Sequence, residues 1–495
     1  MKLSLPDAII FFILVAGNIV LGASFFRKNR TSAQFTKGGG TIPAWVVGMS
    51  IFATFVSSIS FLGLPGKAYT SDWNAYVFSL SIPFASYAAI RFFVPLYREV
   101  GNVSAYYYLE TRFGPWARIY ASSCYILTQL MRTGAILLLL ALPVNALFGW
   151  DVGTVIILTG IAVILYSMLG GIQAVIWTDT IQGLILIAGA IACAAFITFS
   201  MPEGPSQVFR IASAQHKFSL GSLGTSLRDS TFWVVLFYGL FINLQNYGID
   251  QNYIQRYMVS RNEKEAKSSA LFGSLLYIPV SALFFYIGTA LYSYYTAQPE
   301  LLPPELKQPG SGDKVFPYFI ASGLPAGMTG LLIAAIFSAG MSTVSTSLNS
   351  AATIFLSDYY KRYFNKNASE KSSMRVLHFS SFFTGILGIV IALSLVGVES
   401  VLDAWWALAS IFSGGMLGLF LLGYISKKTT RSDAVIAVIA GVLLITWMSL
   451  SPVYFTGEKF IAFRSQFHAN LTIVFGTMII FLTGFILSNI IRRKK

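Results

Sequence analysis

Charged residues are scarce in this chain. Only 11% of its 495 residues are Asp, Glu, Lys or Arg, and 55% are hydrophobic. A soluble domain carries about 25% charged residues, so this composition excludes an ordinary water-soluble protein and indicates a chain that crosses a membrane many times. Cysteine is also rare: Cys124 and Cys193 both lie in apolar runs. A framework of disulfide bonds is therefore not indicated.

Nucleotide-binding and metal-binding motifs are missing as well. The sequence has no G-x-x-x-x-G-K-[ST] phosphate-binding loop, which argues against ATP as a source of energy. Its three histidines, His216, His378 and His468, lack the spacing of a metal site. No run resembles a channel selectivity filter, and an enzyme would need a catalytic cluster. We therefore expect no enzyme, no resident cofactor and no channel.

Long hydrophobic runs dominate what is present. Apolar windows of about 20 residues are the signature of transmembrane helices, and they predict an all-α polytopic membrane protein. Thirteen such windows lie near residues 6–26, 42–65, 72–97, 115–148, 153–171, 178–200, 231–255, 270–296, 324–357, 376–397, 402–424, 433–450 and 468–490.

Basic residues are distributed unequally between the connecting loops. With the N-terminus outside, 23 Lys and Arg fall on the cytoplasmic side, among them the loop from Arg256 to Lys267, and 9 fall outside. The other two, Arg91 and Arg132, lie within spans. The positive-inside rule then predicts a cytoplasmic C-terminus in a bacterial inner membrane. It also explains the net charge of +14 without a nucleic-acid partner.

Two ionisable residues stand within or beside apolar runs, where a charge is costly unless it is paired or faces water. Arg132 lies deep in "LTQLMRTGAILLLLALPV", and Asp179 lies near the beginning of the span that contains "WTDTIQG". Arg132 is either a structural ion-pair partner or a fixed cation for an anionic solute. Asp179 is either an interfacial N-cap, favourable at the positive end of a helix dipole, or part of a cation site.

The stretch "FSAGMSTVSTSLNSAAT" (337–353) carries many hydroxyl groups inside an apolar span. Spacings of 3, 4, 7 and 8 residues place side chains on one helix face, and this face holds Ser338, Ser342, Ser345, Thr346 and Asn349. One interpretation is close helix packing, with the hydroxyls bonded to their own helix. The other is a Na⁺ site, since hydroxyl and carbonyl oxygens suit hard cations.

Two spans are predicted to be interrupted. "GMSIFATFVSSISFLGLPGKAY" places Ser57, Ser58 and Ser60 in mid-span, where hydroxyls compete for backbone hydrogen bonds. Five spans later, an apolar run is interrupted by polar residues and a glycine: Asn243, Gln245, Asn246 and Gly248. Broken helices at matching positions of inverted repeats are typical of secondary transporters.

These segments resemble the sodium:solute symporter family. The resemblance runs through about residues 5–490 and rests on "FATFVSSISFLGLPGKAYTSDW", "GGIQAVIWTDTIQG", "DQNYIQRY" and "GLLIAAIFSAGMSTVSTSLNSAATIFLSDYY". It implies one transporter domain (1–495) with a LeuT-type fold of two inverted repeats of five helices, 42–200 and 231–424. An extra N-terminal helix at 6–26 and two C-terminal helices at 433–490 complete the thirteen.

The resemblance is strongest to bacterial sodium/sialic acid symporters and implies three groups of site residues. A first sodium site would use Ala53, Val56, Ala339, Ser342 and Thr343. A second sodium site would use Asp179, Ser342, Ser345 and Thr346. The solute would contact Ser57, Ser60, Arg132, Phe55, Ser79 and Asn246, with Arg132 on its carboxylate.

The solute pocket departs from those relatives. Phe55 stands where they have threonine, Ser79 where they have glutamine, and Ala75 where they have phenylalanine. We therefore expect a monomeric symporter that couples Na⁺ to uptake of sialic acid or another sugar acid. A neutral sugar or polyol remains the alternative, in which Arg132 is structural.

Overall fold

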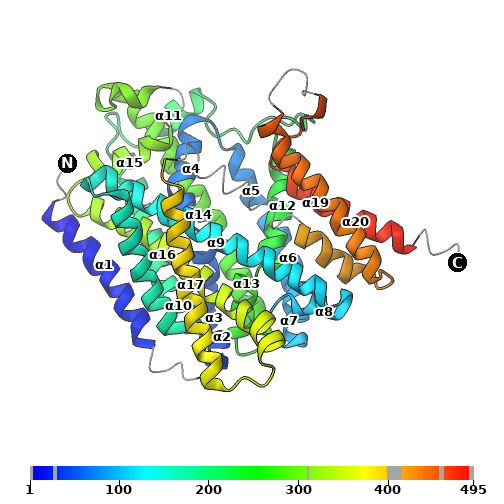
Figure 1. The fold of residues 1–495 in the computed structure, drawn as a ribbon. Coiled ribbons are helices and arrows are strands. Elements are labelled where there is room, and N and C mark those ends of the chain that lie inside the picture. The colour runs from blue at the N-terminus through cyan, green and yellow to red at the C-terminus, as the bar shows by residue number, and fades with distance from the viewer. Residues whose placement is uncertain (1–3, 26–30, 309–311, 398–414, 456–461, 490–495) are drawn as a thin grey trace.

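The computed structural model describes residues 4–25, 31–308, 312–397, 415–455 and 462–489 (Figure 1). Within these ranges the fold is helical and contains no strand, which confirms the predicted all-α class. The N-terminal half consists of α1 (Leu5–Ser24), α2 (Ser32–Lys37), η2 (Gly38–Gly40), α3 (Ala44–Phe55), α4 (Ser58–Thr70), η3 (Asn74–Tyr76), α5 (Val77–Leu80), α6 (Ile82–Ala88), η4 (Ala89–Phe93), α7 (Val94–Val100), α8 (Tyr107–Phe113), α9 (Pro115–Phe148) and α10 (Val152–Phe199). The C-terminal half consists of α11 (Ser206–Ala214), α12 (Phe232–Ile249), α13 (Gln251–Val259), α14 (Glu263–Ala297), η5 (Pro299–Leu301), η6 (Pro304–Lys307), α15 (Gly312–Ser322), α16 (Met328–Ile354), η7 (Phe355–Phe364), α17 (Glu370–Ser394), α19 (Arg431–Tyr454) and α20 (Leu471–Asn489).

Ten helices of the described residues are long and apolar enough to cross a membrane, and each matches a predicted span. The other three predicted spans correspond to shorter segments. The 42–65 span is divided between α3 and α4, and the 153–171 span is the apolar helix Val152–Met168. Of the 402–424 span, only the helix Gly415–Ile425 lies among the described residues.

The first predicted break is confirmed between α3 and α4. Val56 and Ser57 have extended backbone (φ −78°, ψ 121° and φ −115°, ψ 172°), so the helical hydrogen-bond ladder is interrupted there and carbonyl oxygens are released from it. Helical bonding resumes when the Phe61 N–H donates to the Ser57 carbonyl.

The second break lies later than predicted. The polar run from Asn243 to Gly248 lies inside α12, and the extended residue is Asp250, between α12 and α13. The reason is capping: the Asp250 carboxylate accepts the Asn252 N–H at 2.7 Å and so starts α13. The Asn243 amide instead donates sideways to Ser81 Oγ at 3.0 Å, which leaves α12 intact.

Gly171 divides α10 into the two predicted spans. Its backbone has φ 55° and ψ −160°, a conformation that glycine adopts without steric cost. The second span therefore begins near Gly171, and Asp179 lies about two turns inside it. The interpretation of Asp179 as an N-cap is wrong for this reason.

α16, which carries the hydroxyl-rich stretch, is the central helix. Every residue of α16 except Met328 and Leu331 is buried, and the helix packs against α1, α9, α10 and α17. Its N-terminus is fixed by Asp7 of α1, whose carboxylate accepts the N–H groups of Gly327 and Gly330 at 2.7 and 2.8 Å. α1 lies on one side of the bundle, and α19 and α20 lie on the opposite side (Figure 1).

Candidate functional site

Asp179 lies at the meeting point of α3, α10, α13 and α16. Its Oδ1 accepts a hydrogen bond from Ser342 Oγ at 2.6 Å, and its Oδ2 accepts one from Ser50 Oγ at 2.7 Å. Arg256 Nη2 also donates to Oδ2, at 2.6 Å. The Asp179 side chain is fully buried, so this ring of donors is what permits a carboxylate at that depth.

Arg256 is the cation of this cluster, and its assignment to a cytoplasmic loop is wrong. Its side chain is fully buried because it is the sixth residue of α13, which resumes the interrupted span after Asp250. The guanidinium donates to Ser50 Oγ at 2.7 Å, to the Asn252 carbonyl at 2.6 Å and to Thr346 Oγ1 at 2.9 Å. It therefore joins Asp179 to the hydroxyl face of α16.

The four residues predicted for a second sodium site lie around this ion pair. Ser342 bonds to Asp179, and Thr346 bonds to Arg256. Ser345 turns its hydroxyl back to the Ser342 carbonyl at 3.1 Å. The structure thus brings the hydroxyl face and the carboxylate together, with an arginine among them that the sequence did not place there.

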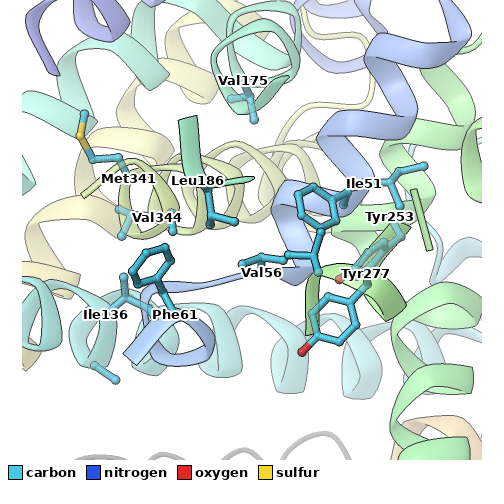
Figure 2. Close-up of a cluster of buried hydrophobic side chains, with 14 of the residues drawn as sticks. Ile51, Val56, Phe61, Ile136, Val175, Leu186, Tyr253, Tyr277, Met341 and Val344 are labelled. Atoms are coloured by element: carbon cyan, nitrogen blue, oxygen red, sulfur yellow. The ribbon is translucent and has the colours of Figure 1, made fainter. Parts of the chain in front are cut away.

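The five residues predicted for a first sodium site come from the broken helix and from α16. α16 contacts both α3 and α4, and Ala53, Val56 and Ala339 are all buried. Thr343 Oγ1 donates to the Ala339 carbonyl at 3.0 Å. Figure 2 shows Val56 at the break, with Val344 of α16 and Phe61 on one side and Tyr253 and Tyr277 on the other.

Arg132 of α9 also reaches the broken helix. Its Nη2 donates to the Thr54 carbonyl at 3.3 Å, one residue before Phe55. The side chain is half-buried and interacts electrostatically with Asp250 at the second break. Arg132 therefore stands between the two interrupted helices, where guanidinium N–H groups can bind a planar carboxylate.

Phe55 is surrounded by aromatic rings. It stacks on Tyr247 with ring centroids 5.6 Å apart and meets Tyr277 edge-on at 4.4 Å. Tyr253 and Phe78 complete the group at 6.4 and 6.2 Å. The three tyrosines are buried, and Phe55 and Phe78 are partly exposed. Aromatic faces of this kind can pack against the apolar face of a sugar ring.

The other predicted solute contacts differ in their surroundings. Ser57 lies in the break, and Ser60 lies beside the Tyr277 hydroxyl. Asn246 is half-buried on α12. Ser79 is buried and shares a 2.9 Å hydrogen bond with Ser281, so its hydroxyl is directed to α14. Ser281 in turn interacts with Tyr277, which packs against Phe55, so Ser79 lies near the aromatic group.

Arg256 and Ser50 are the site residues that the sequence did not reveal. Ser50 is an isolated serine in an apolar run, with no neighbouring residue that indicates a partner. Arg256 did carry a signal: with Asn252 and Gln255 it forms a polar face at helical spacing directly after the interrupted span. The signal is easily missed because Arg256 directly follows the predicted span 231–255 and so falls among the basic residues of the next loop.

Residues 35–441 match the family model described as the sodium:solute symporter family. The sodium/sialic acid symporter SiaT of Proteus mirabilis is 35% identical over 443 residues, 88% of each chain. The sodium/sialic acid symporter NanT of Aliivibrio fischeri is 34% identical over 447 residues, 89% of this chain and 87% of that one. A solved Na⁺-coupled sialic acid symporter in a substrate-bound, outward-open state, with a novel Na⁺ site, superposes with a TM-score of 0.90 at 32% identity over 98% of each chain.

Proposed function

The chain belongs to the sodium:solute symporter family, and we propose that the solute it imports with Na⁺ is sialic acid or another sugar acid. Na⁺-coupled symport follows from the family, and the protein is a multi-pass transporter rather than an enzyme. The acidic solute is supported by one observation above all: Arg132 stands half-buried at the broken helix, bonded there to the Thr54 carbonyl. Its remaining N–H groups are suited to a carboxylate.

The first Na⁺ is proposed to bind where α16 crosses the α3–α4 break. Its ligands are the carbonyl oxygens of Ala53, Val56 and Ala339 and the hydroxyls of Ser342 and Thr343. Carbonyl and hydroxyl oxygens replace the hydration shell of a hard cation well. Binding would tie the broken helix to α16, and loss of Na⁺ to a low-sodium cytoplasm would release that connection and the solute.

The second Na⁺ is proposed to bind between Asp179 and the hydroxyls of Ser342, Ser345 and Thr346. Arg256 already donates to Asp179 and Thr346, so this ion and the guanidinium share one carboxylate. Their mutual repulsion makes the second Na⁺ the weaker one, and binding requires Arg256 to give up part of its contact.

The proposed topology places the N-terminus outside and the C-terminus in the cytoplasm of a bacterial inner membrane, with one monomer as the transporting unit. Moving Arg256 from a loop to the buried site leaves 22 basic residues on the cytoplasmic side against 9 outside, so the charge bias persists. Within the single domain 1–495, segments 42–200 and 231–424 form the two repeats, and 6–26 and 433–490 flank them. The breaks at Val56 and Asp250 support this division.

A neutral sugar or polyol is the second candidate. The aromatic group around Phe55 favours it, because aromatic faces bind sugar rings without any need for charge. In that case Arg132 would have only a structural role: it would connect the two helix breaks through Thr54 and Asp250.

Calorimetric binding in detergent distinguishes the two candidates. The purified protein is titrated with N-acetylneuraminate and, separately, with its methyl ester, each in NaCl and in KCl. The proposal predicts binding of the acid that requires Na⁺ and is at least about ten-fold tighter than binding of the ester, as expected for one charge-assisted pair of hydrogen bonds. Equal binding of acid and ester would contradict the role of Arg132, and equal binding of the acid in both salts would contradict coupling.

A further inference from the structure

The polar face of α16 does not end at the second sodium site. Asn349 lies on the same face three residues after Thr346, and Thr353 lies four residues after Asn349. All three side chains are buried. Asn349 Nδ2 has no hydrogen-bond partner among the described residues. An unpartnered amide at that depth is costly, so this continuation is more than packing.

The side chain of Gln255 lies across this polar face. Gln255 of α13, the neighbour of Arg256, is 1% exposed. Its Nε2 lies 2.9 Å from Asn349 Oδ1, 3.2 Å from Thr353 Oγ1 and 2.8 Å from the carbonyl of Thr36 in α2. Two N–H groups thus serve three acceptors. The Gln255 amide therefore holds α2, α13 and α16 together across the polar face.

A cavity opens immediately beyond the Gln255 amide. Its volume is about 880 Å³, and its wall includes Thr36 and Thr353, two of the three acceptors of Gln255. From Thr36 the polar surface continues to Ser32, and Ser32 donates its N–H and Oγ to the carboxylate of Glu370 at 2.7 and 3.2 Å. The α2 side of the cavity is thus lined with oxygen atoms up to a carboxylate.

Most of the charged side chains in the cavity wall are basic. Lys361, Arg362 and Lys366 contribute to it, together with Arg118. Arg118 and Arg362 are both bound to Glu110. Lys37 of α2 also lines the cavity, and Lys361 interacts electrostatically with Glu370, so among the described residues Glu370 is the one carboxylate of the wall, beside mostly basic side chains.

We propose that this polar face is the route by which the second Na⁺ reaches the cytoplasm, and that the Gln255 amide is the seal on it. The proposal rests on the proposed second sodium site. Thr346 to Thr353 spans seven residues, about 10 Å along the helix, and once Arg256 has given up its contact with Thr346 the Gln255 amide is the next side chain bonded across this face. When α13 moves away from α2, the amide leaves its acceptors, and the oxygens of Asn349 and Thr353 become available to Na⁺.

The test is leakage of Na⁺ in the absence of solute. Proteoliposomes that contain the full chain are loaded with radioactive sodium, and its efflux is measured with no sugar present. Gln255→Ala removes the seal, and Gln255→Glu keeps its shape but removes both N–H donors. Both variants should raise the efflux by on the order of ten-fold, as expected for the loss of about two ordinary hydrogen bonds. The Glu variant keeps the test decisive if the Ala variant does not fold.

Gln251 provides the matched control. It lies one turn away on the same helix and is equally buried, but its amide bonds to the backbone of Ala105 and Val103 at 2.9 and 2.7 Å. Gln251→Ala should leave the efflux at the wild-type level. A rise equal to that of Gln255→Ala would mean that the leak reflects general loosening, and would overturn the proposal.

A double variant identifies where the route begins. Adding Thr346→Val to Gln255→Ala should return the efflux towards the wild-type rate, since the ion must first bind at the second site. Efflux that stays high in the double variant, or wild-type efflux in both Gln255 variants, would overturn the route. Neither result bears on the proposed symport. The symport proposal would be contradicted by a different result, namely that Na⁺ does not promote solute binding by the wild-type protein.

Discussion

Replacing Asp179 with Asn removes the negative charge from a fully buried ion pair whose Oδ2–Nη2 distance is 2.6 Å. Arg256 then keeps its bonds to Ser50, to the Asn252 carbonyl and to Thr346, but its charge is no longer balanced. Removing one partner of a buried pair costs about 3–5 kcal/mol. At roughly 2 °C per kcal/mol for a large domain, the melting temperature in Na⁺-free buffer should fall by about 6–10 °C.

The double variant Asp179→Asn/Arg256→Gln separates the structural role from the ion-binding role. It removes both charges and restores a neutral pair, so most of the lost stability should return, as measured by thermal unfolding in detergent. Uptake as a function of Na⁺ concentration should still show a Hill coefficient of about one, against about two for wild type, because the carboxylate ligand is absent.

Two results would refute this reasoning. If the double variant regains both the melting temperature and a Hill coefficient of about two, Asp179 serves only to balance Arg256. If the single variant melts like wild type, the ion pair does not carry the charge balance described here. Arg256→Gln alone is the complementary measurement, and it should strengthen Na⁺ binding at Asp179 because the competing cation is gone.

Three further predictions concern other parts of the chain. Arg132→Gln should weaken binding of the sugar acid by about ten- to a hundred-fold, the effect of losing hydrogen bonds to a charged group, while binding of its methyl ester changes little; calorimetry of both ligands checks this. Asp7→Asn should destabilise the protein by about 1.5–3 kcal/mol, because the carboxylate holds two N–H groups at the start of α16; thermal unfolding measures it. The pKa of Glu110 is lowered from its usual 4.5, because hydrogen bonds from two arginines outweigh the opposing effect of partial burial. Stability from this cluster is therefore present above pH 4.5 and is lost as the pH falls through the lower folded-state pKa, and Glu110→Gln should flatten that acid-side loss in unfolding measured against pH.

The spans and the first break follow from local sequence, and so they could be predicted. Apolar runs of spanning length and the clustered Ser57, Ser58 and Ser60 are signals contained within about twenty residues. The second break is harder to place from the sequence, because Asn243 to Gly248 resemble helix breakers when they are taken alone. The Asn243 amide bonds to Ser81 on a neighbouring segment in the structure, and the capping carboxylate of Asp250 decides where the next helix begins.

Of the buried ion pair in the site, the sequence predicts Asp179 but not its partner Arg256. Asp179 was evident because a carboxylate in an apolar run needs a partner, but the partner lies 77 residues away in the chain and was counted as a loop charge. Spacing along one helix shows which hydroxyls share a face; it does not show which other helix meets that face. The same limit applies to Ser79, whose bond to Ser281 depends on the packing of α14.

Uptake into proteoliposomes tests the central claim most directly. Vesicles containing the purified protein are given radiolabelled N-acetylneuraminate with an inward Na⁺ gradient, with an inward K⁺ gradient, or with equal Na⁺ on both sides. The account predicts accumulation above the external concentration only with the Na⁺ gradient, and its collapse when an ionophore dissipates that gradient. Accumulation that is the same under all three conditions, or no accumulation of any sugar acid under the Na⁺ gradient, would contradict it.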